Sequence, residues 1–261
     1  MTTPVPGRFS NRIAAVIGGG SGMGRAISHR LASEGAHVYV VDLSADAAKT
    51  VAEEILADGG AAQPEQVNAT SSDDLRALYA RIDEQHGKLH VLHHQVGMPG
   101  PAGIEVSEED WARNIDVNVK SCWYATTLAF DLLKRGDQKA SVTMTASTSA
   151  LVGSPFSPIY SLTKGALVAY ARALALVGAP DGIRVNVIAP GAVDTPMLAQ
   201  FFGRDPGANV DDLMGNFIAS IPLGRAAQPA EIAGVVAFLA SDDAGMVTGV
   251  TIPIDGGQVA K

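Results

Sequence analysis

Short apolar runs rich in β-branched residues alternate with longer helix-like segments along almost the whole chain. The apolar runs predict strands at Ile13–Ile17, Val38–Val41, Leu89–Leu92, Val142–Thr145, Val185–Ile188 and Val250–Ile254. The segments between them predict helices at Met23–Ser33, Ala45–Ala57, Asp73–Gln85, Glu108–Lys134, Ile159–Val177, Asp211–Ala219 and Ala230–Leu239. Near-continuous apolarity is typical of strands covered on both faces. The pattern therefore predicts one α/β domain over residues 1–261, with a mostly parallel, doubly wound sheet.

The stretch from Pro190 to Pro222 breaks this rhythm, because it interleaves prolines and glycines with large apolar residues. The apolar residues are Met197, Leu198, Phe201, Phe202, Met214 and Phe217. Apolar side chains on a breaker-rich segment indicate a lid over an apolar ligand. The alternative is a surface loop held down by its own apolar residues.

A glycine-rich turn, Gly18-Gly19-Gly20-Ser21-Gly22-Met23-Gly24, joins the first predicted strand to the first helix. Glycines let the backbone approach a pyrophosphate, and the helix N-terminus supplies free N–H donors. A tight turn without a ligand is the alternative. Asp42 ends the second strand, where a carboxylate can accept hydrogen bonds from an adenosine ribose and repel a 2′-phosphate. Because no Lys or Arg occurs in the turn and Leu43 follows Asp42, the sequence favours NAD over NADP.

Tyr160 and Lys164 lie four residues apart on one predicted helix, and Ser147 follows the strand Val142–Thr145. With the glycine turn, the run Pro190-Gly191-Ala192-Val193-Asp194-Thr195-Pro196-Met197 and the tail that ends in Asp255-Gly256-Gly257, these residues resemble the short-chain dehydrogenase/reductase family. The resemblance spans nearly the whole chain. It implies a Rossmann-type domain with a seven-stranded sheet, with residues 190–222 as the substrate lid.

The chemistry follows from the side chains. Oxidation of an alcohol by a nicotinamide requires removal of the hydroxyl proton, and a tyrosinate favoured by a neighbouring ammonium can accept it. Ser147 would hold the substrate oxygen, and in the reverse direction Tyr160 would act as the acid. By the resemblance, Lys164 also binds the nicotinamide ribose, and Asn118 positions a proton-relay water. A role in kinking the helix is the alternative for Asn118.

The resemblance carries over further residues to the two binding sites. The cofactor set is Gly18, Ser21, Gly22, Met23, Gly24, Asp42, Leu43, Asn68, Ala69, His94, Val96, Tyr160, Lys164, Pro190, Gly191, Val193, Thr195 and Met197. The substrate set is Met98, Ser147, Ser149, Tyr160, Gly191, Met197, Phe201 and Phe202. The implied reaction interconverts a secondary alcohol and a ketone on a small to medium, largely apolar substrate, cyclic ones included.

The sequence departs from the family at His94-Gln95-Val96-Gly97, where Asn-Asn-Ala-Gly is usual. We expect cofactor binding to survive, because the ribose contact is commonly made by backbone. His93 and His94 face opposite sides of a strand and have no acidic or cysteine partner at ligand spacing, so we expect hydrogen-bonded core histidines and no metal. Asn68 replaces an Asp that often faces the adenine amine, and its carbonyl can still accept from that amine.

Composition excludes several other classes. The chain has 19 basic and 27 acidic residues, a net charge of −8, and no basic block for nucleic acid. Cys122 is the single cysteine, which excludes an internal disulfide. Met1–Arg12 lacks the apolar core of a signal peptide, and no apolar run approaches the roughly 18 residues of a membrane span, so we expect a cytoplasmic protein. A homotetramer is the family expectation. The alternatives are an NADPH-dependent 3-oxoacyl-thioester reductase and a non-catalytic dinucleotide-binding regulator.

Overall fold

Seven strands form one continuous parallel sheet in the computed structural model, which describes residues 3–202 and 209–260. The strands are β1 Ile13–Ile17, β2 His37–Asp42, β3 Ala61–Gln66, β4 Val91–His94, β5 Ser141–Thr145, β6 Arg184–Pro190 and β7 Thr251–Ile254. Their order is β3-β2-β1-β4-β5-β6-β7. The sheet that the sequence predicted as mostly parallel is therefore parallel at every pairing between these strands.

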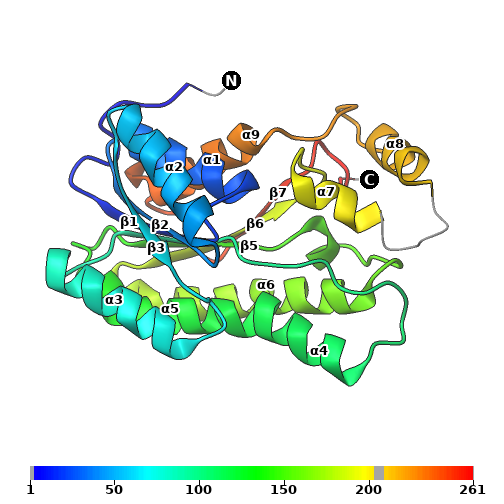
Figure 1. Cartoon of the computed structure of the whole chain (residues 1–261), viewed down its shortest axis with the longest axis horizontal. Helices are drawn as coiled ribbons and strands as arrows, with labels where there is room; N and C mark the ends of the chain where they lie inside the picture. Colours follow the sequence, from blue (N-terminus) through cyan, green and yellow to red (C-terminus); the bar gives the residue numbers. More distant parts are fainter. Residues whose placement is uncertain (1–2, 203–208, 261) are drawn as a thin grey trace.

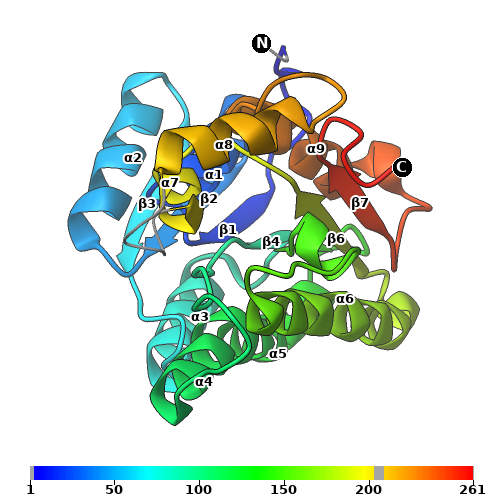
Figure 2. The ribbon, with the colours of Figure 1, turned by 90° about the vertical axis from the view of Figure 1, so that its right-hand side faces the viewer.

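Helices cover both faces of the sheet (Figure 1). One layer holds α1 Gly22–Ser33, α2 Ala45–Ala57 and α9 Pro229–Ala240. The other holds α3 Ser72–His86, α4 Glu108–Ile115, α5 Ser121–Lys134 and α6 Pro158–Gly178. Two more helices, α7 Pro196–Phe202 and α8 Val210–Ala219, lie on the α1 side, beyond one end of the strands (Figure 2). The predicted lid thus contains two helices, and its residues 203–208 lie outside the described part of the chain.

The two layers enclose separate cores, because successive side chains of a strand point to opposite faces. In β1, Ile13, Ala15 and Ile17 pack with α3, α5 and α6, whereas Ala14 and Val16 pack with α1, α2 and α9. All five are nearly inaccessible to solvent. This double burial explains why the central strands have unbroken apolar runs in the sequence.

The sequence pattern missed β3. Its sequence Ala-Ala-Gln-Pro-Glu-Gln has no large apolar side chain and is half exposed, because the strand lies at the sheet edge and pairs only with β2 among the described strands. Pro64 is tolerated there, since an edge strand has one side without a partner strand. The predicted helix Glu108–Lys134 is also divided: a π-helical segment, Asp116–Lys120, separates α4 from α5.

One helix passes a length and composition test for a membrane span, contrary to the sequence expectation. The segment Pro158–Asp181, which contains α6, has a mean hydropathy of 1.3 over an 18-residue window. Ten of its residues, among them Leu167 and Ala171, are buried, and both of these pack in the core beneath the sheet. Its apolarity is therefore that of a core helix.

The order of the strands positions the site. The chain leaves β1 toward β2 on one side and later returns to β4 on the other, so the carboxyl ends of β1 and β4 flank the point where the winding direction reverses. In open α/β sheets ligands bind in the crevice at this point. The glycine turn, Gln95 and Ser147 all follow strands that end at this edge.

Candidate active site

The glycine turn presents an uncapped helix N-terminus. Ser44, Ser71 and Ser107 cap α2, α3 and α4 by accepting a backbone N–H, but the Ser21 side chain makes no such bond to α1. Gly18 and Gly22 have positive φ angles of 86° and 51°, which other residues rarely adopt. The first amides of α1 are therefore left to an anion, as phosphate binding requires.

The turn is packed too closely for side chains. A Cβ at Gly24 would lie 1.9 Å from the Gly18 carbonyl oxygen, and a Cβ at Gly20 would lie 2.8 Å from Asp42 Oδ2. The Gly20 N–H donates to this carboxylate oxygen at 2.9 Å. The glycines thus bring Asp42 against the turn and leave a backbone surface that a diphosphate can approach.

A cleft runs from Asp42 over the glycine turn. Its lining residues are Gly18, Ser21, Gly22, Met23, Asp42, Leu43, Gln95, Val96, Gly97, Thr195, Pro196, Met197 and Gln200. The Asp42 carboxylate accepts one hydrogen bond on each oxygen, from Gly20 N–H and Ser44 N–H, so further lone pairs remain for hydroxyl donors. Asp42 is the single charged residue in this described lining. An acceptor at one end and free amides at the turn fit a dinucleotide.

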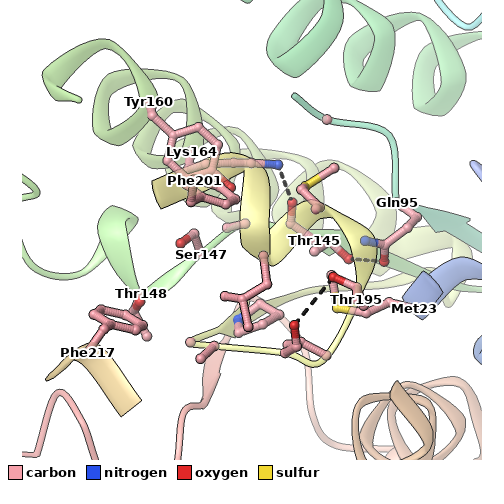
Figure 3. A pocket seen from close by; sticks show the side chains of 18 residues that line it. Met23, Gln95, Thr145, Ser147, Thr148, Tyr160, Lys164, Thr195, Phe201 and Phe217 are labelled. Carbon is pink, nitrogen blue, oxygen red and sulfur yellow. Dashed lines mark hydrogen bonds between the residues drawn. The ribbon is translucent and has the colours of Figure 1, made fainter. Parts of the chain in front are cut away.

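A second pocket adjoins the first and is lined by three of the four predicted catalytic residues, Ser147, Tyr160 and Lys164 (Figure 3), whereas Asn118 lines neither cavity. Its lining residues are Met23, Gln95, Gly97, Thr145, Ala146, Ser147, Thr148, Tyr160, Lys164, Pro190, Gly191, Ala192, Val193, Thr195, Met197, Leu198, Phe201 and Phe217. Five residues line both cavities, namely Met23, Gln95, Gly97, Thr195 and Met197. The two cavities therefore meet, as a cofactor that extends from the glycine turn to Tyr160 requires.

Tyr160 and Lys164 lie one turn apart on α6, and both are buried. The Lys164 Nζ donates to the Thr145 carbonyl at 3.0 Å and lies 5.7 Å from the centre of the Tyr160 ring. Burial lowers the pKa of Lys164 to about 8, although Cys122 acts weakly in the opposite direction. The ammonium is thus held beside the phenol ring.

Ser147 directly follows β5 and begins a short 3₁₀ segment, Thr148–Ala150. Its Oγ accepts the Ser149 N–H at 3.2 Å, which leaves the hydroxyl proton of Ser147 for donation. Phe201 of α7 packs edge-on against Tyr160 with ring centres 5.2 Å apart. Helices α7 and α8 therefore bring Met197, Leu198, Phe201 and Phe217 into the same pocket lining as the predicted catalytic residues, at the place predicted for a lid.

Some predicted residues lie outside these linings. They are Gly24, Asn68, Ala69 and His94 of the cofactor set and Met98 and Ser149 of the substrate set. The Asn68 carbonyl already accepts two hydrogen bonds from Thr70, so it is not poised for adenine. Ser149 contacts Ser147 through its backbone. The side chain of Phe202 lies outside the described part of the structure.

Sequence reasoning missed several lining residues. They are Gln95, Gly97, Thr145, Ala146, Thr148, Ala192, Pro196 and Gln200, whereas Leu198 and Phe217 were predicted only as apolar residues of the lid. Gln95 and Thr145 carried a usable signal, since polar residues at the carboxyl ends of parallel strands face the crevice. Phe217 carried only the general apolarity of the lid.

Comparison with known proteins agrees with this geometry. A family model described as "Enoyl-(Acyl carrier protein) reductase" matches residues 18–258. The chain is 34% identical to cyclohexanol dehydrogenase from Acinetobacter sp. (strain SE19) and 33% identical to meso-2,3-butanediol dehydrogenase from Serratia marcescens, with 97% of each chain covered in both cases. The crystal structure of levodione reductase matches with a TM-score of 0.91 and 30% identity over 97% of this chain and 99% of that one. The chain belongs to the short-chain dehydrogenase/reductase family. It is an oxidoreductase of this family that acts on alcohol or ketone groups.

Within this short-chain dehydrogenase/reductase, Asn118 uses its side chain to fasten the loop after β4. Its Oδ1 accepts the Met98 N–H at 2.7 Å, and its Nδ2 donates to the Met98 carbonyl at 3.1 Å. Nδ2 also lies 3.3 Å from Thr163 Oγ1. Asn118 is fully buried in the π-helical segment, so its amide is occupied by protein groups. These contacts give Asn118 a structural role in the loop after β4, while the predicted role in positioning water and the alternative role in kinking the helix both stay predictions.

His93 and His94, of which His94 replaces a residue usual in the family, are buried and hydrogen-bonded, as predicted. His94 Nε2 lies 3.0 Å from Ser121 Oγ, and His93 Nε2 lies 3.1 Å from Gln95 Oε1. Burial lowers the pKa of His93 to about 4 and that of His94 to about 3, with Lys164 adding to the shift of His94. Among the described residues no cluster of three potential metal ligands occurs. Both rings are therefore neutral core groups at neutral pH.

We expect acid to destabilise the protein through these two histidines. A histidine with a pKa of about 6.5 when unfolded binds its proton more readily in the unfolded state, so the free energy of unfolding falls as pH drops below about 6.5. Each pH unit in this window removes about 1.4 kcal/mol per histidine, until the pKa of the folded state is reached.

Between pH 6.5 and pH 4.5 the free energy of unfolding of the His94→Asn variant should therefore fall by about 2–3 kcal/mol less than that of the wild type. Urea titrations of both proteins at several pH values measure this difference. Parallel curves for wild type and variant over this range would contradict the assignment.

Proposed function

We propose that this protein is an NAD-dependent dehydrogenase that interconverts a secondary alcohol and a ketone by acid–base catalysis at Tyr160. The observation that carries the proposal is the convergence of Ser147, Tyr160 and Lys164 in an apolar pocket that opens onto a cleft ending at Asp42. The cofactor would lie along this cleft, with Asp42 at its adenosine end and Lys164 at its nicotinamide end. When bound, it supplies a nicotinamide that accepts or donates hydride.

The side chains divide the remaining work. Ser147 donates its free hydroxyl proton to the substrate oxygen and holds that oxygen against Tyr160. The Tyr160 phenolate accepts the alcohol proton, and the phenol returns a proton when a ketone is reduced. The Lys164 ammonium, held by the Thr145 carbonyl, stabilises the phenolate. Phe201 and the other apolar residues of α7 and α8 exclude water from the reacting groups.

The lining also limits the substrate. Lys164 is the single charged side chain among the described lining residues of the catalytic pocket, and it is engaged with Thr145. Aromatic and aliphatic side chains of Phe201, Phe217 and Leu198 also line this pocket. These features support a small to medium, largely uncharged substrate, and the cyclohexanol dehydrogenase relative makes cyclic alcohols the first class to test.

The proposal is tested by NAD and NADP reduction across cyclic, aryl and aliphatic secondary alcohols. Turnover of at least one class with NAD is expected. The alternative is a reductase of acyl thioesters, a class that the description of the matching family model also names. Asp42 disfavours the predicted 3-oxoacyl-thioester reductase, because that enzyme would use NADPH and the carboxylate repels a 2′-phosphate. Activity confined to NADPH and acyl thioesters would favour that alternative. NADH binding without turnover of any substrate would favour the non-catalytic regulator.

Asp42 should determine the choice of cofactor. The substitution Asp42→Asn keeps an acceptor for the Gly20 N–H but removes the charge that repels a 2′-phosphate. We expect kcat/KM for NAD to fall about 10- to 100-fold, since hydrogen bonds to charged groups contribute about 1.5–3 kcal/mol. The ratio of NADP to NAD activity should rise. Asp46→Asn, at an exposed position on the first turn of α2, is the matched control. An unchanged ratio in Asp42→Asn would contradict the role of Asp42.

Two further parts of the proposal concern the context of the enzyme. A homotetramer assembled through α5 and α6 is supported by exposed apolar residues on these helices, namely Trp123, Leu176 and Val177. A cytoplasmic location is consistent with the acidic composition and the soluble type of fold. Both stay predictions.

A further inference from the structure

Gln95 occupies the junction of the two cavities, where the family usually has Asn. It follows β4 directly, and its side chain lines both the cleft of Asp42 and the pocket of Tyr160. Figure 3 shows its amide at the edge of the pocket, with the oxygen linked to Thr145. The mechanism above gives this residue no part.

Two neighbours fix the orientation of the Gln95 amide. Thr145 Oγ1 donates to Gln95 Oε1 at 2.9 Å, and His93 Nε2 lies 3.1 Å from the same oxygen. Because an amide oxygen can only accept, a hydrogen bond between these two atoms requires the His93 proton on Nε2. The ring of His93 is fully buried, so this donor cannot turn to solvent. The carbonyl end of Gln95 is therefore held on the protein side.

The other end of the amide remains available. Within the described part of the chain, Gln95 Nε2 has no hydrogen-bond partner and is not enclosed, since it borders the cleft. A dinucleotide that extends from Asp42 to Tyr160 must cross the junction lined by Gln95. The middle of such a molecule consists of phosphate and ribose groups, which are rich in acceptor oxygens.

We propose, on the basis of the proposed function, that Gln95 is a cofactor-positioning residue whose amide N–H donates to an acceptor oxygen in the middle of the dinucleotide. Thr145 contacts both Gln95 and Lys164. Its hydroxyl holds Gln95 while its carbonyl holds the Lys164 ammonium, so one residue sets the position of both groups. Thr145 thus couples the position of Gln95, and of a cofactor bound to it, to the position of Lys164.

Binding measurements without substrate test this role. The substitution Gln95→Glu keeps the acceptor for Thr145 and His93, removes the N–H donor and places a negative charge beside the acceptor oxygens. Gln95→Met removes the donor without adding charge, and Thr145→Val removes the group that orients the amide. Gln85→Glu makes the same charge change on the exposed surface of α3 and serves as the matched control. The ligands are NADH, followed by fluorescence, and AMP, followed by calorimetry.

We expect Gln95→Glu to raise the Kd of NADH about 30-fold and Gln95→Met about 10-fold, as for lost hydrogen bonds to a charged group. Thr145→Val should raise it several-fold. The Kd of AMP should change less than twofold in each variant, because AMP lacks the second phosphate and the nicotinamide ribose that lie toward Tyr160. Gln85→Glu should leave both constants unchanged.

Two results would overturn the proposal while the proposed function stands. One is NADH binding within twofold of wild type in both Gln95 variants. The other is an equal weakening of AMP and NADH, which would indicate a general disturbance of the cleft. A wild-type protein that binds no NADH would instead overturn the proposed function, and the role of Gln95 with it.

Discussion

Replacement of Tyr160 by Phe is expected to lower kcat at least 1,000-fold and to leave NADH binding within about threefold of wild type. General acid–base groups contribute about 10²- to 10⁴-fold, and the Tyr160 hydroxyl is the assigned proton donor and acceptor of this pocket. Phe keeps the ring that packs edge-on against Phe201, so the pocket should retain its shape. Steady-state kinetics with the best alcohol of the panel, together with NADH fluorescence titration, measures both quantities.

Tyr124→Phe provides the matched control, since Tyr124 lies on α5 and lines neither cavity. Its kcat should equal that of wild type. Retention of more than a tenth of wild-type kcat in Tyr160→Phe would show that another group transfers the proton. Loss of NADH binding in that variant would instead point to a structural role of the hydroxyl.

Replacement of Lys164 by Met should lower kcat/KM about 100- to 1,000-fold, because the phenolate loses the neighbouring cation and the cofactor loses a donor. In the wild type the pKa of Lys164 is about 8, so its charge and its assistance to Tyr160 decline above that pH. Lys49→Met, on the exposed surface of α2, is the control and should have wild-type kinetics. A Lys164→Met variant with wild-type kcat/KM would contradict the role of the ammonium.

The same variant should alter the pH dependence of stability. Lys164 has a pKa of about 8 when folded and 10.5 in the reference state, so the unfolded chain binds more protons between these values. The wild-type free energy of unfolding should therefore rise with pH through this window, by about 3 kcal/mol relative to Lys164→Met. Below pH 8 the burial of the charge disfavours folding by the full amount. Urea titrations of both proteins at pH 7.5 and pH 10.5 measure this change. If the free energies of unfolding of wild type and Lys164→Met differed by the same amount at both pH values, the prediction would be wrong.

Much of the fold could be predicted from the sequence, because strands that are buried on both faces have continuous apolar runs. Strands β1, β2, β5 and β6 coincide with the predicted apolar runs to within a few residues, and the helices between them begin near their Ser caps. The missed strand, β3, supports this explanation. An edge strand needs few apolar side chains, so Gln63, Pro64 and Glu65 give no apolar run from which the strand could be predicted. The π-helical segment at Asp116–Lys120 could not be predicted either, since it changes the backbone hydrogen bonding and not the pattern of apolar residues.

For the site, the sequence by itself determined those features that depend on residues close together in the chain. The glycine turn depends on adjacent backbone geometry, and Tyr160 and Lys164 depend on one helical turn, so both could be located from the chain alone. Only the tertiary structure decided which separate segments meet. The link between Gln95 and Thr145 and the position of Phe217 in the pocket lining bring together residues that follow β4, end β5 and lie on α8. Such contacts arise from the packing of distant elements, and no local pattern in the chain records them, because each residue satisfies its own strand or helix equally well without its partner.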